Sequence, residues 1–301
     1  MKLIQRCMIN GERVEIADIN LVLTLNAAGR GFISVNNLSP EHSLAGAMVQ
    51  IDLGRDGEVW RYFSGYVERD QPAENGSRRL FIREAAAVLD FDFPCSMQHP
   101  TLREVLDNLG RQSGIVFITP DADYVNTPTP YITHSGSGTQ LLNQLGRAFS
   151  ISDYVWHPMP DGSVFVGSAA DSRFASITMP DIPQQYTLGQ SGGNSIDIMF
   201  METVRPGVNL PAGRITRVAL NNEKMTLTWE RLTVTGSPVS KSPLRRQMET
   251  QFPELASGTL HTRLARVIAP TESATLGDVA DSFRPRYAVD VQLLDEDGND
   301  K

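Results

Sequence analysis

Only two cysteines, Cys7 and Cys95, occur among the 301 residues, and they lie far apart with no CxxC pair. This spacing excludes a cysteine-rich zinc site and a disulfide-dense scaffold, so both thiols are expected to be free and buried. No stretch approaches the roughly 20 apolar residues of a membrane helix. The N-terminal segment also lacks the apolar region of a signal peptide. We therefore expect no membrane anchor, and synthesis in a cytoplasm.

An excess of positive charge is missing as well, since the formal net charge is −8. A chain this acidic has no electrostatic footprint for sequence-specific nucleic-acid binding. Acidity would suit a surface past which DNA slides without sticking, because like charges repel. Solubility alone is the other explanation.

Motifs that would indicate catalysis, metal binding or a cofactor are weak. The five histidines show neither HxH nor HxxxH spacing, which argues against a preformed zinc site; they are His42, His99, His134, His157 and His261. The string from His134 to Gly138 indicates a helix cap rather than a nucleophile elbow. Asp295, Asp297 and Asp300 resemble part of a calcium loop, but the rest of the loop is missing. Glu84, Asp90 and Asp92 could supply a glycosidase pair, but acidic pairs are common and this set carries little weight. We expect no catalytic residue, metal or cofactor.

The pattern along the chain predicts a mainly β fold with an α+β insertion. In residues 1–93, Asn10-Gly11 between β-rich runs indicates a hairpin, and about six strands follow at short spacing, as in a small barrel or sandwich. In residues 94–170, Thr101 and Glu104 form a capping-box signature, and Thr139 is expected to cap a second helix. Three aromatic residues are expected in the core: Trp60, Tyr62 and Trp156.

Residues 171–240 return to β structure, with residues 184–194 expected as a mobile surface loop because they are rich in Gln, Gly and Ser. Residues 241–301 are predicted to hold a linker, a short helix at 244–248 and two strands near 264–268 and 287–293. Two strands alone rarely hold together, so these should pack on the rest of the chain or on a partner.

The order of these segments, together with several strings, resembles the hub family of phage baseplates, which includes the hub half of type VI valine-glycine repeat proteins. The strings are Phe63–Glu68, Leu80–Leu89, Thr101–Gln112, Gln140–Gly167, Val204–Val208 and Gly213–Ile215. The resemblance implies two tail-tube-like barrels, at 1–93 and 171–240. Three chains would form a pseudo-six-fold ring that joins the tail tube to a central spike. Residues from about Arg263 resemble the start of an oligonucleotide/oligosaccharide-binding (OB) barrel, but the chain stops before that barrel could close.

The implied partners are two further copies of the chain, a tail-tube or distal tail protein, a spike protein and a tape-measure protein. The implied location is the virion tail or baseplate, after synthesis in the host bacterial cytoplasm. Arginine is favoured at interfaces because its planar fork makes several hydrogen bonds at once. We therefore predict that Arg205, Arg214 and Arg217 lie near a subunit contact; a solvated strand edge is the alternative.

Other functions stay open at this point. The hub of a contractile bacteriocin or secretion device would have the same fold. A tail-associated cell-wall hydrolase and a glycan-binding module belong to another class, and a hydrolase would require acids or a metal converging in one pocket. The hub interpretation expects an acidic channel lining, a non-enzymatic assembly and a structural role in DNA ejection.

Overall fold

The computed structural model describes residues 3–36, 43–55, 57–73, 77–175, 177, 182, 186–192, 194–230, 265–270 and 289–293. The chain divides into two units, Met1–Val239 and Ser240–Lys301. The predicted helix at 244–248 and the acids Asp295, Asp297 and Asp300 lie outside the described residues. Within the described part of the chain, no helix is long and apolar enough to cross a membrane.

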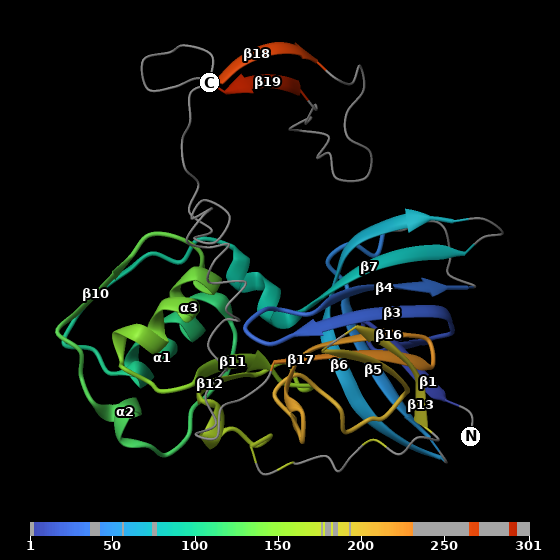
Figure 1. Cartoon of the computed structure of the whole chain (residues 1–301), viewed down its shortest axis with the longest axis horizontal. Helices are drawn as coiled ribbons and strands as arrows, with labels where there is room; N and C mark the ends of the chain where they lie inside the picture. Colours follow the sequence, from blue (N-terminus) through green and yellow to red (C-terminus); the bar gives the residue numbers. More distant parts are fainter. Residues whose placement is uncertain are drawn as a thin grey trace. The chain divides into compact units, whose positions relative to one another are not determined.

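A twelve-stranded antiparallel sheet dominates the first unit (Figure 1). Its N-terminal strands are β1 (Ile4–Ile9), β2 (Glu12–Val14), β3 (Ile16–Thr24), β4 (Arg30–Val35), β5 (Met48–Arg55), β6 (Glu58–Pro72) and β7 (Arg78–Glu84). Its later strands are β13 (Thr187–Gly192), β14 (Ser195–Met199), β15 (Asn209–Leu210), β16 (Gly213–Asn221) and β17 (Lys224–Glu230). The strand order is β13-β14-β17-β16-β3-β4-β7-β6-β5-β1-β2, with β15 paired to β16. The mainly β character predicted from the sequence is confirmed.

Local chemistry explains the first hairpin. Asn10 and Gly11 have φ values of 49° and 86°, the left-handed conformation that a two-residue hairpin turn needs. The turn pairs Cys7 with Val14 and Ile9 with Glu12. Alternation then decides which face of each strand is buried, because successive side chains point to opposite sides of a sheet. In β3, for example, Ile19, Leu21 and Leu23 are all buried.

The seam between β3 and β16 joins two segments that are nearly 200 residues apart in the chain. Leu21 lies opposite Leu220, and Thr24 lies opposite Arg217. At one end of the seam, the Asn222 side chain accepts from the Ile19 amide at 3.1 Å. One hydrophobic core lies against the strands on both sides of this seam. The predicted division into barrels at 1–93 and 171–240 stays a prediction, while the hydrogen bonds place the strands of both segments in one sheet.

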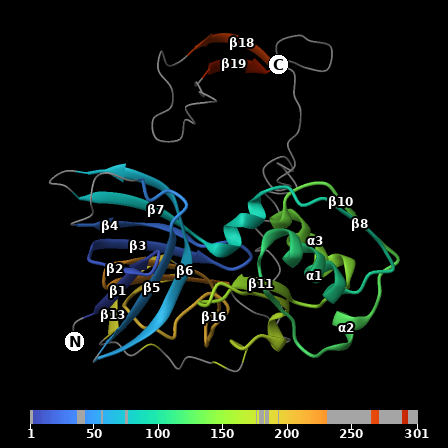
Figure 2. The same cartoon turned by 180° about the vertical axis from the view of Figure 1, so that it is seen from behind.

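The α+β insertion forms a second core, beside the sheet in both views (Figures 1 and 2). Its elements are the 3₁₀ helix η2 (Ala85–Asp90), β8 (Cys95–Gln98), α1 (Leu102–Ser113), β9 (Phe117–Ile118), α2 (Asp123–Asn126), β10 (Tyr131–His134), α3 (Gly138–Ala148), β11 (Tyr154–Pro158), β12 (Val164–Ser168) and the 3₁₀ helix η3 (Ala169–Asp171). The predicted capping box at Thr101 and Glu104 is present, and Gly114 ends α1 with φ 75°. The strands β11 and β12 pair with each other, so that Trp156 lies opposite Val166 and His157 lies opposite Phe165.

Two local predictions are wrong. Ser137, not Thr139, caps α3, and Gln140 completes the capping box. Thr139 lies one residue inside the helix and donates its hydroxyl to Asp90 at 2.8 Å. Residues 184–194 are not simply a loop, because Thr187–Gly192 form β13 against β14. The pairing of β13 with β14 is made by backbone groups, so it does not require alternating apolar side chains in β13. The ladder has two register shifts, where one strand carries an extra residue.

The second unit contains an antiparallel pair, β18 (Ala265–Pro270) and β19 (Val289–Leu293). Val267 lies opposite Val291, and a register shift follows between Val267 and Ala269. Both strands were predicted, and they pair with each other. Whether they begin an OB-like barrel stays a prediction.

Candidate functional site

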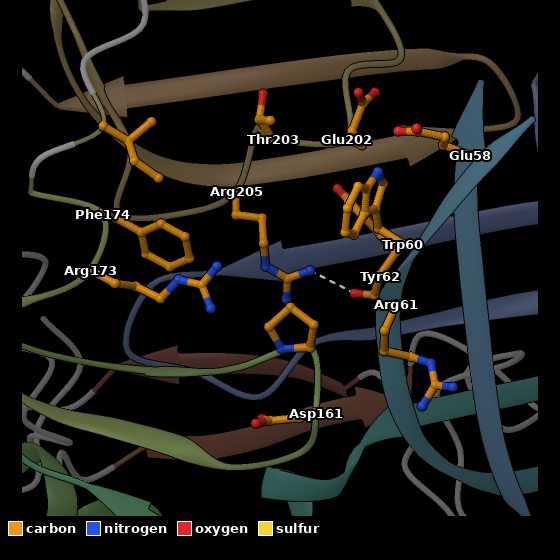
Figure 3. A pocket seen from close by; sticks show the side chains of 12 residues that line it. Glu58, Trp60, Arg61, Tyr62, Asp161, Arg173, Phe174, Glu202, Thr203 and Arg205 are labelled. Atoms are coloured by element: carbon orange, nitrogen blue, oxygen red, sulfur yellow. Dashed lines mark hydrogen bonds between the residues drawn. The ribbon is translucent and has the colours of Figure 1, made fainter. Parts of the chain in front are cut away.

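A pocket of about 550 Å³ opens on the first unit where β6 meets the turn between β11 and β12 (Figure 3). Two further segments close it, one after η3 and one between β14 and β15. The lining residues are Glu58, Trp60, Arg61, Tyr62, Pro160, Asp161, Arg173, Phe174, Ile177, Glu202, Thr203 and Arg205. Four stretches that are remote in sequence therefore meet here.

Arg205 forms the inner wall of the pocket and is only 6% exposed. Its guanidinium donates to the Tyr62 carbonyl oxygen at 2.6 Å, the dashed contact in Figure 3. A second nitrogen lies 3.5 Å from Glu84 Oε1, and the guanidinium carbon is 5.1 Å from the centre of the Tyr62 ring. Arg205 thus ties the segment before β15 to β6 and to the end of β7.

Glu84 lies behind Arg205, within the protein. The Gly29 amide donates to Glu84 Oε2 at 2.5 Å. A side chain at position 29 would collide with the carboxylate, since a Cβ there would lie 2.7 Å from Oε2. Burial raises the pKa of Glu84, while Arg205 and the Gly29 amide oppose the rise. This acid is enclosed by protein and does not line the pocket.

His157 is buried beside the pocket wall between two aromatic rings. Its ring lies 5.2 Å from the centre of Phe165 and 5.0 Å from that of Phe174. Burial lowers the pKa of His157 to about 4; the Pro158 backbone opposes the shift, and Arg205 and Arg173 add to it. The imidazole is therefore neutral at pH 7 and acts as part of the aromatic packing.

One end of the pocket combines an exposed aromatic side chain with two carboxylates. Trp60 is 59% exposed, so its predicted place in the core is wrong, whereas Tyr62 and Trp156 are buried as expected. Glu58 and Glu202 lie at the same end of the pocket as the indole (Figure 3). Because alternate residues of a strand share a face, Glu58 and Trp60 could have been read as exposed together. Such a surface suits contact with a cationic or amphipathic group.

The three arginines predicted at a subunit contact are not brought together. Arg214 is 2% exposed and makes a two-pronged ion pair with Asp153, at 2.9 and 2.8 Å, and a further contact with Glu230 at 3.2 Å. Arg217 is exposed on β16. Of these three arginines, only Arg205 lines the pocket. Arg205 and Arg214 are thus satisfied within the chain, and the proximity of all three to a subunit contact stays a prediction.

The weaker candidates are accounted for by local structure. His134 bonds to the Ser137 carbonyl oxygen at 2.9 Å, at the cap of α3. Asp90 pairs with Arg83 at 2.5 Å, and Asp92 forms an isolated bridge with Ser137. Among the residues described, no cluster of three or more His, Cys, Asp or Glu side chains could hold a metal ion.

Comparisons with known proteins agree with this architecture. No family model matches the chain. The chain is 42% identical over 300 residues to an uncharacterized 58.7 kDa protein of the lys 3′ region of Haemophilus phage HP1; the match covers all of this chain and 55% of that protein. The chain thus spans about half the length of this relative.

Three solved structures share the fold. A 43 kDa tail protein of prophage MuSo2 from Shewanella oneidensis has a TM-score of 0.57 at 12% identity, over 76% of this chain and 98% of that one. A tail protein from Neisseria meningitidis has a TM-score of 0.55 at 10% identity, and the match covers 76% of this chain and 96% of that one. An Escherichia coli component of the type VI secretion system has a TM-score of 0.51 at 10% identity, and the match covers 98% of this chain and 90% of that one. That component is described as structurally similar to the T4 tail proteins gp27 and gp5.

These similarities define the class of fold: the chain shares it with a prophage tail protein, a second bacterial tail protein and a type VI secretion component. The resemblance to the phage baseplate hub family that the sequence suggested is confirmed at the level of the fold.

Proposed function

We propose that the chain is a structural tail protein of a bacteriophage, the hub that joins the tail tube to the central spike. The observation that carries this proposal is the fold shared with a prophage tail protein and with a second tail protein, combined with a phage relative that matches the whole chain. Three copies would form a pseudo-six-fold ring around the DNA channel, with a tail-tube or distal tail protein on one side and a spike protein on the other. A tape-measure protein would occupy the channel.

The sheet topology supports assembly with other chains. In the described part of the chain, the sheet path ends at β13 on one side and at β2 on the other. Exposed strand edges present unpaired backbone groups that can pair with another chain, and a closed ring removes them. An obligate ring of this kind should bury more than about 2,000 Å² in total. The pair β18–β19 would take part in the junction with the spike.

Native mass spectrometry of the purified chain tests the oligomeric state, and cryo-electron microscopy of assembled particles tests the location. We expect a trimer in solution and three copies around the channel axis. A single copy per particle, or a position away from the axis, would contradict the proposal.

A second candidate is the hub of a secretion device or contractile bacteriocin, which the similarity to a type VI secretion component favours. Finding the chain in particles that contain DNA-filled heads would decide for a phage.

Among the residues that the structure describes, the exposed Trp60 beside two carboxylates is the feature that would suit a glycan-binding or cell-wall-degrading module. A zymogram against peptidoglycan tests it. We expect no lysis, and lysis that Glu58→Gln or Glu202→Gln abolishes would contradict a purely structural role.

A further inference from the structure

A ring of three copies places a strict demand on each chain. A contact in which the same surface faces itself joins copies only in pairs, so a three-membered ring needs two different surfaces that complement each other. This inference therefore rests on the proposed trimer. Two surfaces of the first unit have opposite charge and carry accessible aromatic rings.

The first surface, called the Arg–Phe patch, consists of Arg30 and Phe32 on β4, Arg69 on β6, and Arg79 and Phe81 on β7. The strand register brings these residues together, because Phe32 lies opposite Phe81 and Phe81 lies opposite Arg69. Their neighbours along the strands, including Ile33, Leu80 and Ile82, are buried in the core. The patch therefore occupies the face of the sheet opposite the core.

Within the patch, the phenyl rings hold the guanidinium groups in place. The guanidinium carbon of Arg79 lies 3.8 Å from the centre of the Phe32 ring, and that of Arg69 lies 5.1 Å from the centre of Phe81. The two ring centres are 6.4 Å apart. A ring that covers the flat face of a guanidinium leaves the N–H groups at its edge available for a carboxylate.

Within the described part of the chain, the arginines of the patch are not held in ion pairs. Arg30, Arg69 and Arg79 are exposed and make no ion pair with any residue that the structure describes. Arg83, beside them, is paired with Glu68 and Asp90. This positive surface contrasts with the net charge of −8 of the whole chain.

The second surface, called the acidic rim, consists of Glu58, Trp60 and Glu202 at one end of the pocket (Figure 3). Both carboxylates are exposed and make no ion pair within the described part of the chain. Trp60 contributes the large exposed aromatic area. Tryptophan and arginine are the residues most often found at the energetic centre of protein interfaces.

We propose that the Arg–Phe patch of one copy docks on the acidic rim of the next copy, so that each chain contributes both halves of a head-to-tail contact. The carboxylates of Glu58 and Glu202 would accept from the guanidinium edges, and the indole of Trp60 would pack on the phenyl rings. Nucleic acid is a poorer occupant of the patch. A long polyanion would feel the repulsion of the whole acidic chain, whereas a carboxylate pair acts locally.

Charge reversal tests this contact in the full chain. One variant carries Arg30→Glu and Arg79→Glu, a second carries Glu58→Arg and Glu202→Arg, and a third combines all four substitutions. The control carries Arg103→Glu and Arg111→Glu, which change the net charge as the first variant does but lie on the exposed face of α1. Circular dichroism and a urea midpoint establish that each variant is folded, and sedimentation equilibrium gives its association constant.

We expect the first two variants to associate at least about 100-fold more weakly than the wild type, because attraction becomes repulsion across the contact. The four-fold variant should recover trimer formation, and the control should match the wild type. A wild-type trimer that tolerates either reversal, or a four-fold variant that stays dissociated, overturns this contact but leaves the hub proposal standing. A wild type that stays monomeric overturns the proposed ring itself. Binding of a 30-base-pair DNA duplex that the first variant alone abolishes, with its trimer intact, would assign the patch to nucleic acid instead.

Discussion

Removing Arg205 should destabilise the protein through the acid that it leaves behind. The Arg205 and Glu84 side chains are 7% and 4% exposed, so little solvent screens the pair. Replacing one partner of a buried charge pair strands the other charge, which typically costs about 3–5 kcal/mol. Arg205→Met also takes the donor away from the Tyr62 carbonyl oxygen. We expect a loss of about 3–5 kcal/mol in the free energy of unfolding at pH 8.

The loss should depend on pH with a definite sign. Burial already raises the pKa of Glu84, so between its ordinary pKa and the raised one the native state binds more protons than the unfolded state. The contribution of this carboxyl to stability is therefore fully present below its ordinary pKa and is lost as pH rises through the raised pKa. Without the opposing charge of Arg205 the pKa rises further. Arg205→Met should consequently be less damaging at pH 5 than at pH 8.

A double variant separates the stranded charge from lost packing. Glu84→Gln with Arg205→Met removes both charges and leaves an amide oxygen that can accept from Gly29. Its free energy of unfolding should lie within about 2 kcal/mol of the wild type, since replacing both partners of a buried pair is often nearly neutral. Urea unfolding followed by circular dichroism at pH 5 and 8 measures all three proteins, with Arg103→Met as an exposed control. A single variant that loses less than about 1 kcal/mol at pH 8, or a double variant no better than the single, would refute this reasoning.

Two further outcomes are expected. Ser137→Ala should cost about 1 kcal/mol in urea unfolding because it removes the cap of α3, while Thr139→Ala should cost clearly less; the opposite order would restore Thr139 as the cap. The pKa of His157 is lowered from 6.5 to about 4, so the unfolded state binds the proton first and stability falls as pH drops from about 6.5 towards 4. His157→Phe should reduce that loss by up to about 3 kcal/mol, and an unchanged difference between the pH 7 and pH 4.5 urea midpoints would contradict this cause.

The elements that the sequence predicted well are those whose signal is local. The Asn10-Gly11 turn needs only two adjacent residues, and the cap of α1 needs only Thr101 and Glu104. The strand β13 was missed because it lacks apolar alternation and is held by backbone pairing to β14. Backbone pairing leaves no mark on residue type, so composition alone indicated a loop.

The pocket could not be predicted because its contacts are not local. Arg205 and Glu84 are separated by 121 positions, and Arg205 and Tyr62 by 143. The exposed Trp60 shows the limit of residue type as a guide, since a tryptophan is placed in the core by default. Its neighbour Glu58, on the same face of the strand, was the available signal for exposure.

The strand β6 connects the two surfaces that the further inference pairs. Trp60 belongs to the acidic rim and Arg69 to the Arg–Phe patch, and the nine residue steps of strand from one to the other span about 30 Å. Midway, at Gly65 and Tyr66, the strand is paired with β5 on one side and with β7 on the other. A Cβ at this position would lie 1.8 Å from the Arg83 carbonyl oxygen, so the close approach of the two strands requires glycine. The course of β6 therefore fixes where each chain presents the acidic rim and the Arg–Phe patch. If these two surfaces meet in the ring, the course of this one strand sets the angle between successive copies.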